Sequence, residues 1–215
     1  MLVQDDFLVE QLGPCTVPSP LGLPEGDSEH AAPYVPEVGR IAYEVDFNDG
    51  KPVNPPLLLE KAGPRARLFF DPKKTTVGIV TCGGLCPGLN NVIRSLVLHL
   101  HHKYGVPKVL GFRYGYEGLS PTGADPMTLG PAEVREIHRS GGSILGLGRG
   151  KQPPAAMADT LKRHGVDVLF VVGGDGTLKG AHALAQELLA RGQKVAVVGI
   201  PKTIDNDVAD RKSVV

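Results

Sequence analysis

Short apolar runs alternate with amphipathic segments from Thr75 onward. The runs are rich in β-branched residues, are bounded by glycine or proline, and have the length of buried strands; they cover 76–82, 107–112, 168–172 and 195–200. Apolar residues spaced three or four apart predict helices over 89–103, 128–140, 154–164 and 177–191. Strands that alternate with helices predict an α/β fold, a doubly wound, mostly parallel, Rossmann-like sheet with right-handed crossovers.

The first 74 residues follow a different pattern. Prolines interrupt them so often that no helical period persists, and short strands are expected only at 41–47, 57–61 and 67–70, with a turn at Asn48-Asp49-Gly50. We therefore expect two parts: a Pro-rich, partly mobile N-terminal extension over 1–74 and an α/β lobe over 75–215.

Composition narrows the function classes. The 215 residues are 41% hydrophobic, and 23 basic side chains balance 23 acidic ones. A net charge of zero favours neither a nucleic acid nor a membrane surface as partner. No run approaches the roughly 20 apolar residues of a membrane span, and the acidic N-terminus is unlike a secretory signal. The odd count of three cysteines favours reduced intracellular thiols. We expect a cytoplasmic protein, with a plastid location as the less favoured alternative.

Two strand-end loops carry the strongest candidate chemistry. Glycines flank Asp175 in Gly173-Gly-Asp-Gly-Thr177, so its carboxylate is uncovered and nearby backbone N–H groups can hold phosphate oxygens. Mg2+ prefers few protein oxygens together with substrate phosphate oxygens, which makes Asp175 a candidate metal ligand. The alternative is an ordinary turn in which an aspartate or threonine caps a helix.

The second loop, Pro201-Lys-Thr-Ile-Asp-Asn-Asp207, places Asp205 and Asp207 two residues apart, so both carboxylates point the same way in an extended backbone. One can act as a general base for a hydroxyl while the other orients it. A solvated acidic turn explains the same residues equally well. Gly83-Gly84, between a strand and a helix, permits close approach of an anion, and Arg149 could bridge two phosphates; each is weak evidence alone.

Several of these motifs, in this order, resemble the phosphofructokinase family over residues 75–207. Gly78–Asn91 resembles the first nucleotide loop of its plant and protist branch, and Ser140–Arg149 resembles the loop with the bridging arginine. Gly173–Thr177 and Pro201–Asp207 resemble the metal and base loops. Ala62–Arg65 and Phe69–Pro72 resemble that branch's N-terminal extension. The resemblance implies a glycolytic kinase that uses ATP and Mg2+ to phosphorylate the 1-hydroxyl of fructose 6-phosphate, giving fructose 1,6-bisphosphate.

The family's functional residues transfer to matching positions. The resemblance implies that Asp205 is the catalytic proton acceptor and that Arg149 and Asp207 support catalysis. Asp175 matches the Mg2+ ligand. The expected sugar-binding residues are Thr203, Ile204 and Asp205, and the expected nucleotide-binding residues are Gly83, Arg149, Gly150, Gly174, Asp175, Gly176 and Thr177.

The identity of the phosphoryl donor and the length of the sequence leave alternatives open. Gly176 leaves room for the α-phosphate of ATP, whereas Lys202 stands where pyrophosphate-dependent enzymes have lysine and many bacterial ATP enzymes have glycine. ATP is favoured, since the plant and protist ATP branch combines both. The sequence ends eight residues after Asp207. We therefore expect the nucleotide lobe of an enzyme that is a homo-oligomer, a tetramer, when full length, truncated before the sugar-phosphate lobe. The alternatives are a non-catalytic nucleotide-binding or regulatory protein and a pyrophosphate-dependent phosphofructokinase.

Overall fold

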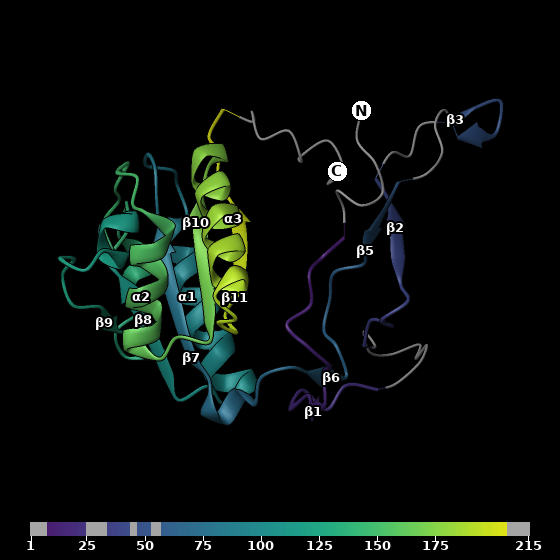
Figure 1. The fold of residues 1–215 in the computed structure, drawn as a ribbon, viewed down its shortest axis with the longest axis horizontal. Coiled ribbons are helices and arrows are strands. Elements are labelled where there is room, and N and C mark those ends of the chain that lie inside the picture. Colours follow the sequence, from purple (N-terminus) through teal and green to yellow (C-terminus); the bar gives the residue numbers. More distant parts are fainter. Residues whose placement is uncertain (1–7, 25–33, 44–46, 53–56, 206–215) are drawn as a thin grey trace. The chain divides into compact units, whose positions relative to one another are not determined.

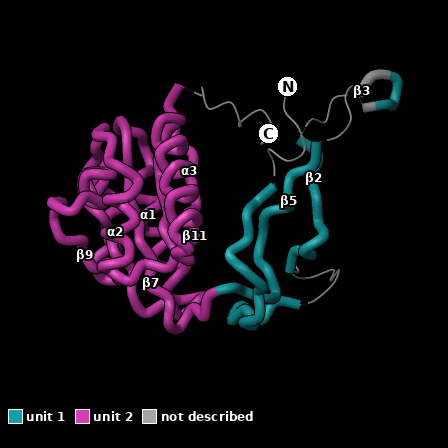
Figure 2. The backbone as a smooth tube through the Cα atoms, in the orientation of Figure 1, with its two compact units in different colours: residues 1–69, 210–215 teal, residues 70–209 magenta. Residues whose placement is uncertain are grey.

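The computed structural model describes residues 8–24, 34–43, 47–52 and 57–205. Their contacts divide the chain into two compact units, one within residues 1–69 and the other within 70–209 (Figure 2). The division falls at Phe70, whereas the proline pattern placed it after residue 74. No helix in the described ranges combines the length and apolar character needed to cross a bilayer.

The first unit consists of short antiparallel pairs. β1 (Val17–Pro18) pairs with β6 (Arg67–Leu68), and β2 (Arg40–Ala42) pairs with β5 (Leu58–Glu60). β3 (Phe47–Asn48) and β4 (Lys51–Pro52) form a hairpin whose two turn residues, Asp49 and Gly50, both have positive φ, as a tight hairpin turn requires. The expected turn is therefore present, while residues 44–46 of the expected strand lie outside the described ranges.

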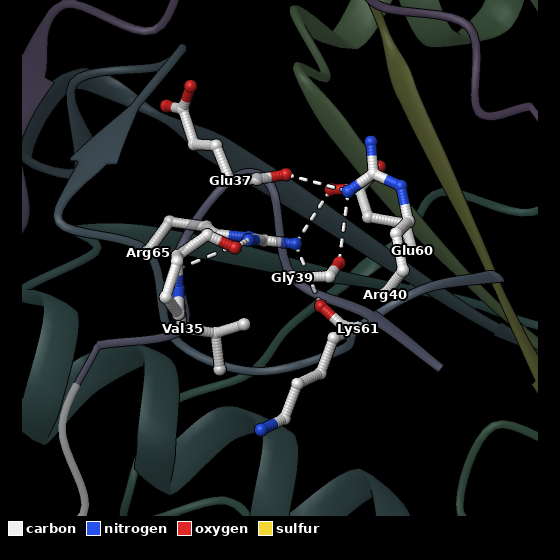
Figure 3. A network of polar contacts seen from close by, with 8 residues as sticks. Val35, Glu37, Gly39, Arg40, Glu60, Lys61 and Arg65 are labelled. Carbon is white, nitrogen blue, oxygen red and sulfur yellow. Dashed lines mark hydrogen bonds and ion pairs between the residues drawn. The ribbon is translucent and has the colours of Figure 1, made fainter. Parts of the chain in front are cut away.

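A hydrogen-bond network that is partly exposed to solvent links separate segments of this unit (Figure 3). The guanidinium of Arg65 donates to the backbone oxygens of Val35, Pro36 and Lys61 at 2.6–3.2 Å. It also forms a 2.7 Å ion pair with Glu60. Arg65 thus links residues 35–36 to residues 60–61, which lie far apart in the sequence. Planar arginine, with five N–H donors, suits several fixed acceptors at once.

The second unit is a five-stranded sheet in the order β11-β10-β7-β8-β9 (Figure 1). β7 (Thr76–Thr81), β8 (Lys108–Phe112), β10 (Val168–Gly173) and β11 (Ala196–Pro201) are parallel, and the two-residue β9 (Met127–Thr128) pairs antiparallel with β8 at one edge. The four long strands match the predicted apolar runs. The α/β, doubly wound fold class is confirmed.

Helices cover both faces of the sheet. α1 (Leu89–His99) packs Ile93 and Val97 against Val77 and Ile79, on one face. On the other face, α2 (Pro154–His164) and α3 (Asp175–Ala190) cover Val80 and its neighbours, because alternate residues of a strand point to opposite sides. α1 continues into a π-helical turn, Leu100–Tyr104, that ends at Gly105 with φ +69°. Two short 3-10 segments, Pro72–Lys74 and Gly115–Leu119, lie next to β7 and β8 in the sequence.

The helix predicted over 128–140 is wrong. One turn forms, with the Val134 N–H donating to Gly130 O, but the next bonds tighten to three-residue spacing and only Ile137–Arg139 is 3-10 helical. In this stretch Val134 is buried completely, while the charged residues around it are exposed. Leu129 is also buried, but it lies five residues before Val134, so the two side chains do not share one helical face and give no apolar stripe that could stabilise further turns.

Candidate functional site

The direction in which successive strands are added to the sheet reverses between β7 and β10, although the two strands are parallel. From β7 the chain moves to β8 on one side, and from β10 it moves to β11 on the other. In such a sheet the loops after the two central strands diverge and leave a crevice at their carboxyl ends, which is the usual ligand site of doubly wound folds. Here those loops are Cys82-Gly83-Gly84 after β7 and Gly174-Asp175 after β10.

The N-terminus of α3 forms one wall of this crevice. Asp175 is its first residue, Gly174 precedes it, and no side chain caps the first turn. Uncapped N–H groups and the positive end of the helix dipole attract anions. Gly173 is required for this geometry, because a Cβ on it would lie 2.5 Å from the Thr177 side chain. A Cβ on Gly176 would meet nothing within 4 Å, so that residue borders open space.

The Asp175 carboxylate forms a 2.8 Å ion pair with Lys179, one turn later on α3. Both side chains are largely exposed, at 70% for Asp175 and 76% for Lys179. An exposed pair of this kind contributes at most about 1 kcal/mol, so the carboxylate is free to exchange its partner for a ligand. The four-residue spacing of Asp175 and Lys179 on a helix is the sequence signal for this pair.

Arg149 approaches the crevice from the opposite side. Its Nη2 lies 3.3 Å from the position that a Cβ on Gly84 would occupy, so the missing side chain makes room for the guanidinium. The backbone of its loop is fixed here, since the Gly83 N–H donates to Gly148 O at 2.9 Å. Gly83 has φ +85°, a conformation that favours glycine.

Lys202 ties the loops together. Its backbone N–H donates to Gly173 O at 2.9 Å, and its ammonium donates to Gly84 O at 2.8 Å. The side chain therefore crosses from the end of β11 to the glycine loop after β7. The sequence singled out Lys202 only for donor choice, and nothing local in the sequence pointed to this bond with Gly84, 118 residues away.

Tyr116 is a site residue that the sequence did not indicate. Its hydroxyl donates a buried 2.6 Å hydrogen bond to Thr177 O, and its ring fills the space beside Gly180, where a Cβ would lie 2.7 Å from Cε2. Burial raises the pKa of Tyr116, and the neighbouring Cys82 raises it further. Burial likewise raises the pKa of the Cys82 thiol to about 12. Both groups are therefore neutral at physiological pH.

These residues enclose a cavity of about 640 Å3. It is lined by all the predicted nucleotide-binding residues, which are Gly83, Arg149, Gly150, Gly174, Asp175, Gly176 and Thr177, and in addition by Cys82, Tyr116, Pro154, Met157, Lys179, Ala183 and Lys202 among others. Such a volume is typical of a site for a small molecule. Glycine backbone and the side chains of Arg149 and Lys202 lie in this lining, together with apolar side chains from α2 and α3.

The predicted sugar-binding residues lie outside this lining. Thr203, Ile204 and Asp205 follow Lys202 directly, and Ile204 is 68% exposed. The Asp205 N–H donates to Thr203 Oγ1 at 3.1 Å, and the Cys86 thiol donates to Thr203 O at 3.8 Å. The loop is thus anchored next to the glycine loop. Asp207 lies outside the described residues.

Comparison with known sequences identifies the family. The family described as Phosphofructokinase matches residues 76–213, well over half of the chain. This chain belongs to the phosphofructokinase family. The assignment covers the α/β unit from the first residue of β7 onward, including every loop that lines the cavity.

Individual proteins and a solved structure of the family are also similar to this chain. An ATP-dependent 6-phosphofructokinase of Entamoeba histolytica is 45% identical over 200 residues, covering 93% of this chain and 44% of that protein. One from Trypanosoma cruzi is 57% identical over 155 residues, covering 72% and 32%. The phosphofructokinase of Pichia pastoris, crystallised in the T-state, superposes with a TM-score of 0.56 and 31% identity over 62% of this chain and 16% of that one. The chain therefore spans less than half the length of these phosphofructokinases.

Proposed function

We propose that this chain carries the nucleotide lobe of an ATP-dependent 6-phosphofructokinase. The enzyme transfers the γ-phosphate of ATP to the 1-hydroxyl of fructose 6-phosphate and so yields fructose 1,6-bisphosphate. One observation carries the proposal: the glycine loop after β7, Arg149 and the uncapped first turn of α3 converge on a single cavity at the switch point of the sheet. The relatives that match this chain at 45% and 57% identity are named for the same activity, which supports the proposal.

In this proposal the triphosphate binds between Gly83 and the N-terminus of α3. The backbone N–H groups of Gly84 and Gly176 donate to phosphate oxygens, and the helix dipole adds a favourable field. Arg149 donates to the transferring phosphoryl group, and its fixed positive charge stabilises the negative charge that develops there. The nucleoside occupies the apolar part of the lining, where Met157 and Ala183 lie.

Asp175 fits a Mg2+ ligand. An exposed carboxylate beside a phosphate-binding helix terminus matches the preference of Mg2+ for one or two carboxylates plus substrate oxygens. Mg2+ held there would neutralise charge on the phosphates. Lys179, which pairs with Asp175 in the structure, would then interact with a phosphate or with solvent.

Asp205 acts as the general base in the proposed mechanism. Its carboxylate accepts the proton of the 1-hydroxyl as that oxygen attacks the γ-phosphorus. The bond from the γ-phosphorus to the β,γ-bridging oxygen breaks, ADP leaves, and Asp207 supports Asp205 electrostatically. Thr203 and Ile204 contact the sugar phosphate. The exposed position of this loop, beside the cavity rather than within it, leaves its face accessible to a second substrate.

Two observations favour ATP over pyrophosphate as donor. Gly176 borders open space, so an α-phosphate and the rest of a nucleotide can be accommodated. The Lys202 ammonium, which pyrophosphate-dependent enzymes share by resemblance, is already bonded to Gly84 O. From the family resemblance we also propose a cytoplasmic enzyme that is a tetramer at full length.

The test measures binding and turnover separately. Because the chain has no tryptophan, a methylanthraniloyl derivative of ATP (mant-ATP) reports binding in the presence of Mg2+. Competition by ATP but not by pyrophosphate supports the proposal, and failure to bind nucleotide contradicts it. In the full-length enzyme, the substitution Asp205→Asn should lower turnover of fructose 6-phosphate by about 10²–10⁴-fold, while the affinity for mant-ATP stays unchanged. Loss of affinity together with turnover would show that Asp205 is not the base.

A further inference from the structure

Thr81, the last residue of β7, is completely buried although it is polar. Its hydroxyl donates to Gly146 O at 2.8 Å and lies 2.9 Å from Ser143 Oγ. A hydroxyl has a single proton, so the Ser143 hydroxyl must be the donor in the second contact. The Leu145 N–H in turn donates to Ser143 Oγ at 3.2 Å. The result is a directional chain in which each hydroxyl both donates and accepts.

Asn90, in the first turn of α1, makes a second buried anchor on the same loop. Only 3% of the residue is exposed. Its Nδ2 donates to Ser140 O and its Oδ1 accepts from the Ile144 N–H, both at 2.9 Å. These two bonds fix the orientation of the amide and satisfy the backbone of a segment that has no regular secondary structure.

The anchored segment is Ser140–Gly148, which leads directly to Arg149. Leu145 is completely buried, its carbonyl accepts from the Tyr114 N–H, and Gly148 O accepts from the Gly83 N–H. The backbone is thus held at Ser140, at its middle and at Gly148. Within the described residues, no hydrogen bond or ion pair holds the Arg149 side chain itself. The position of the guanidinium over Gly84 therefore depends on how firmly its loop is fixed.

We propose that Thr81 and Asn90 are positioning residues for Arg149. Their buried hydrogen bonds hold the Ser140–Gly148 loop so that the arginine faces the triphosphate before it binds. Neither side chain lines the cavity, so both act through Arg149. The inference rests on the proposed nucleotide site. It adds that Arg149 is pre-organised for the triphosphate by Thr81 at the end of β7 and by Asn90 at the start of α1.

The test is a double-mutant cycle on this chain with mant-ATP and mant-AMP as probes. Thr81→Val replaces the hydroxyl by a methyl group of similar size, and Thr81→Ser retains the hydroxyl. Asn90→Asp tests the second anchor of the loop. Its carboxylate can still accept from the Ile144 N–H, but it cannot donate to Ser140 O and repels that oxygen. The matched control is Thr75→Val. Thr75 is also a buried threonine whose hydroxyl donates to a carbonyl, Asp71 O at 2.7 Å, but it precedes β7 at the opposite end of the strand.

We expect Thr81→Val to weaken mant-ATP binding about fivefold, because a less firmly held Arg149 loses part of its contact with the triphosphate, and to weaken mant-AMP binding less than twofold. Thr81→Ser should restore affinity, and Thr75→Val should lower thermal stability without changing either affinity. Adding Thr81→Val to Arg149→Ala should weaken binding no further than Arg149→Ala alone.

Additive losses in the double mutant, or equal losses for both nucleotides, would overturn the positioning role and leave the nucleotide site intact. A wild-type chain that bound no mant-ATP would overturn both proposals. An unchanged affinity in Arg149→Ala would remove the basis of the positioning role, because no cation would then need to be placed. The three outcomes are therefore distinguishable.

Discussion

Replacing Gly176 by aspartate should change stability and nucleotide affinity in opposite directions. Gly176 is the second residue of α3, and a Cβ on it would meet nothing within 4 Å, so a larger side chain fits without strain. The new carboxylate would project toward the cavity, where the phosphates of ATP are proposed to bind. The same change therefore tests the position of the nucleotide without damaging the fold.

Stability should rise slightly. Aspartate is a better helix residue than glycine by about 0.3 kcal/mol. A negative charge in the first turn gains a further ~0.3–1 kcal/mol from the helix dipole. Repulsion by the adjacent Asp175 removes part of this gain, which leaves about 0.5–1 kcal/mol in the free energy of unfolding, measured by urea titration.

Affinity should fall. Two like charges about 4 Å apart repel by about 1–4 kcal/mol between the effective dielectric constants of water and a protein surface. We expect mant-ATP to bind about 10- to 100-fold more weakly in the presence of Mg2+. Gly176→Ala is the steric control, and Gly176→Asn is the uncharged control of the same size. Both should retain affinity within about threefold of wild type if repulsion dominates.

The reasoning would be refuted by a Gly176→Asp variant that is as stable as expected and binds mant-ATP as tightly as wild type. In that case the phosphates do not pass Gly176. A comparable loss in Gly176→Asn would instead show that volume, and not charge, limits the site.

Three further predictions concern other parts of the molecule. Tyr116→Phe should cost about 1 kcal/mol of stability, because Thr177 O loses a buried donor, and should weaken mant-ATP binding about two- to fivefold in the same titrations; unchanged values for both would show that the bond is unimportant. The raised pKa of Cys82 predicts alkaline instability: the unfolded thiol ionises near its ordinary 9.0 and the folded thiol near 12, so stability is fully present below about pH 9 and falls above it, by up to ~1.4 kcal/mol per pH unit. Urea unfolding from pH 8 to 11 should show a shallower fall in Cys82→Ala, and equal slopes would contradict the assignment. Arg65→Lys should destabilise the first unit by about 1–3 kcal/mol, because lysine cannot serve four fixed acceptors, whereas Arg40→Lys, whose two carbonyl partners are exposed, should have little effect; hydrogen exchange in the first unit measures both.

The sequence predicted the elements that depend on local pattern. β7 and β10 are buried on both faces, so their apolar runs are continuous and could be recognised without knowing their neighbours. The loops after them could also be identified, because glycine and aspartate at a strand end have few structural uses. The helix expected over 128–140 is wrong for the opposite reason: its apolar spacing is helical, but the two buried side chains, Leu129 and Val134, are five residues apart and do not share a helical face.

The supporting residues of the site could not be predicted. Thr81 finds its partners 62 and 65 residues later, and Asn90 finds its own 50 and 54 residues later. No local period encodes such pairs. Tyr116 gave no signal either, since its partner Thr177 O is a backbone atom 61 residues away. The loops that line the cavity could be recognised in the sequence, whereas the contacts that hold them in place depend on the tertiary structure.

The central pairing of β7 with β10 has a consequence for folding kinetics. Thr76 N–H donates to the Asp167 carboxylate 91 residues later, and the strands run parallel from there. Closing so long a loop is entropically costly and slow, so this pairing should complete late, after β7, α1 and β8 have associated locally. The crevice does not exist before that step. The proposed ATP site lies in this crevice. Mg2+ and ATP should therefore slow unfolding in stopped-flow experiments and leave the refolding rate nearly unchanged, because the crevice is complete only after β7 and β10 have paired.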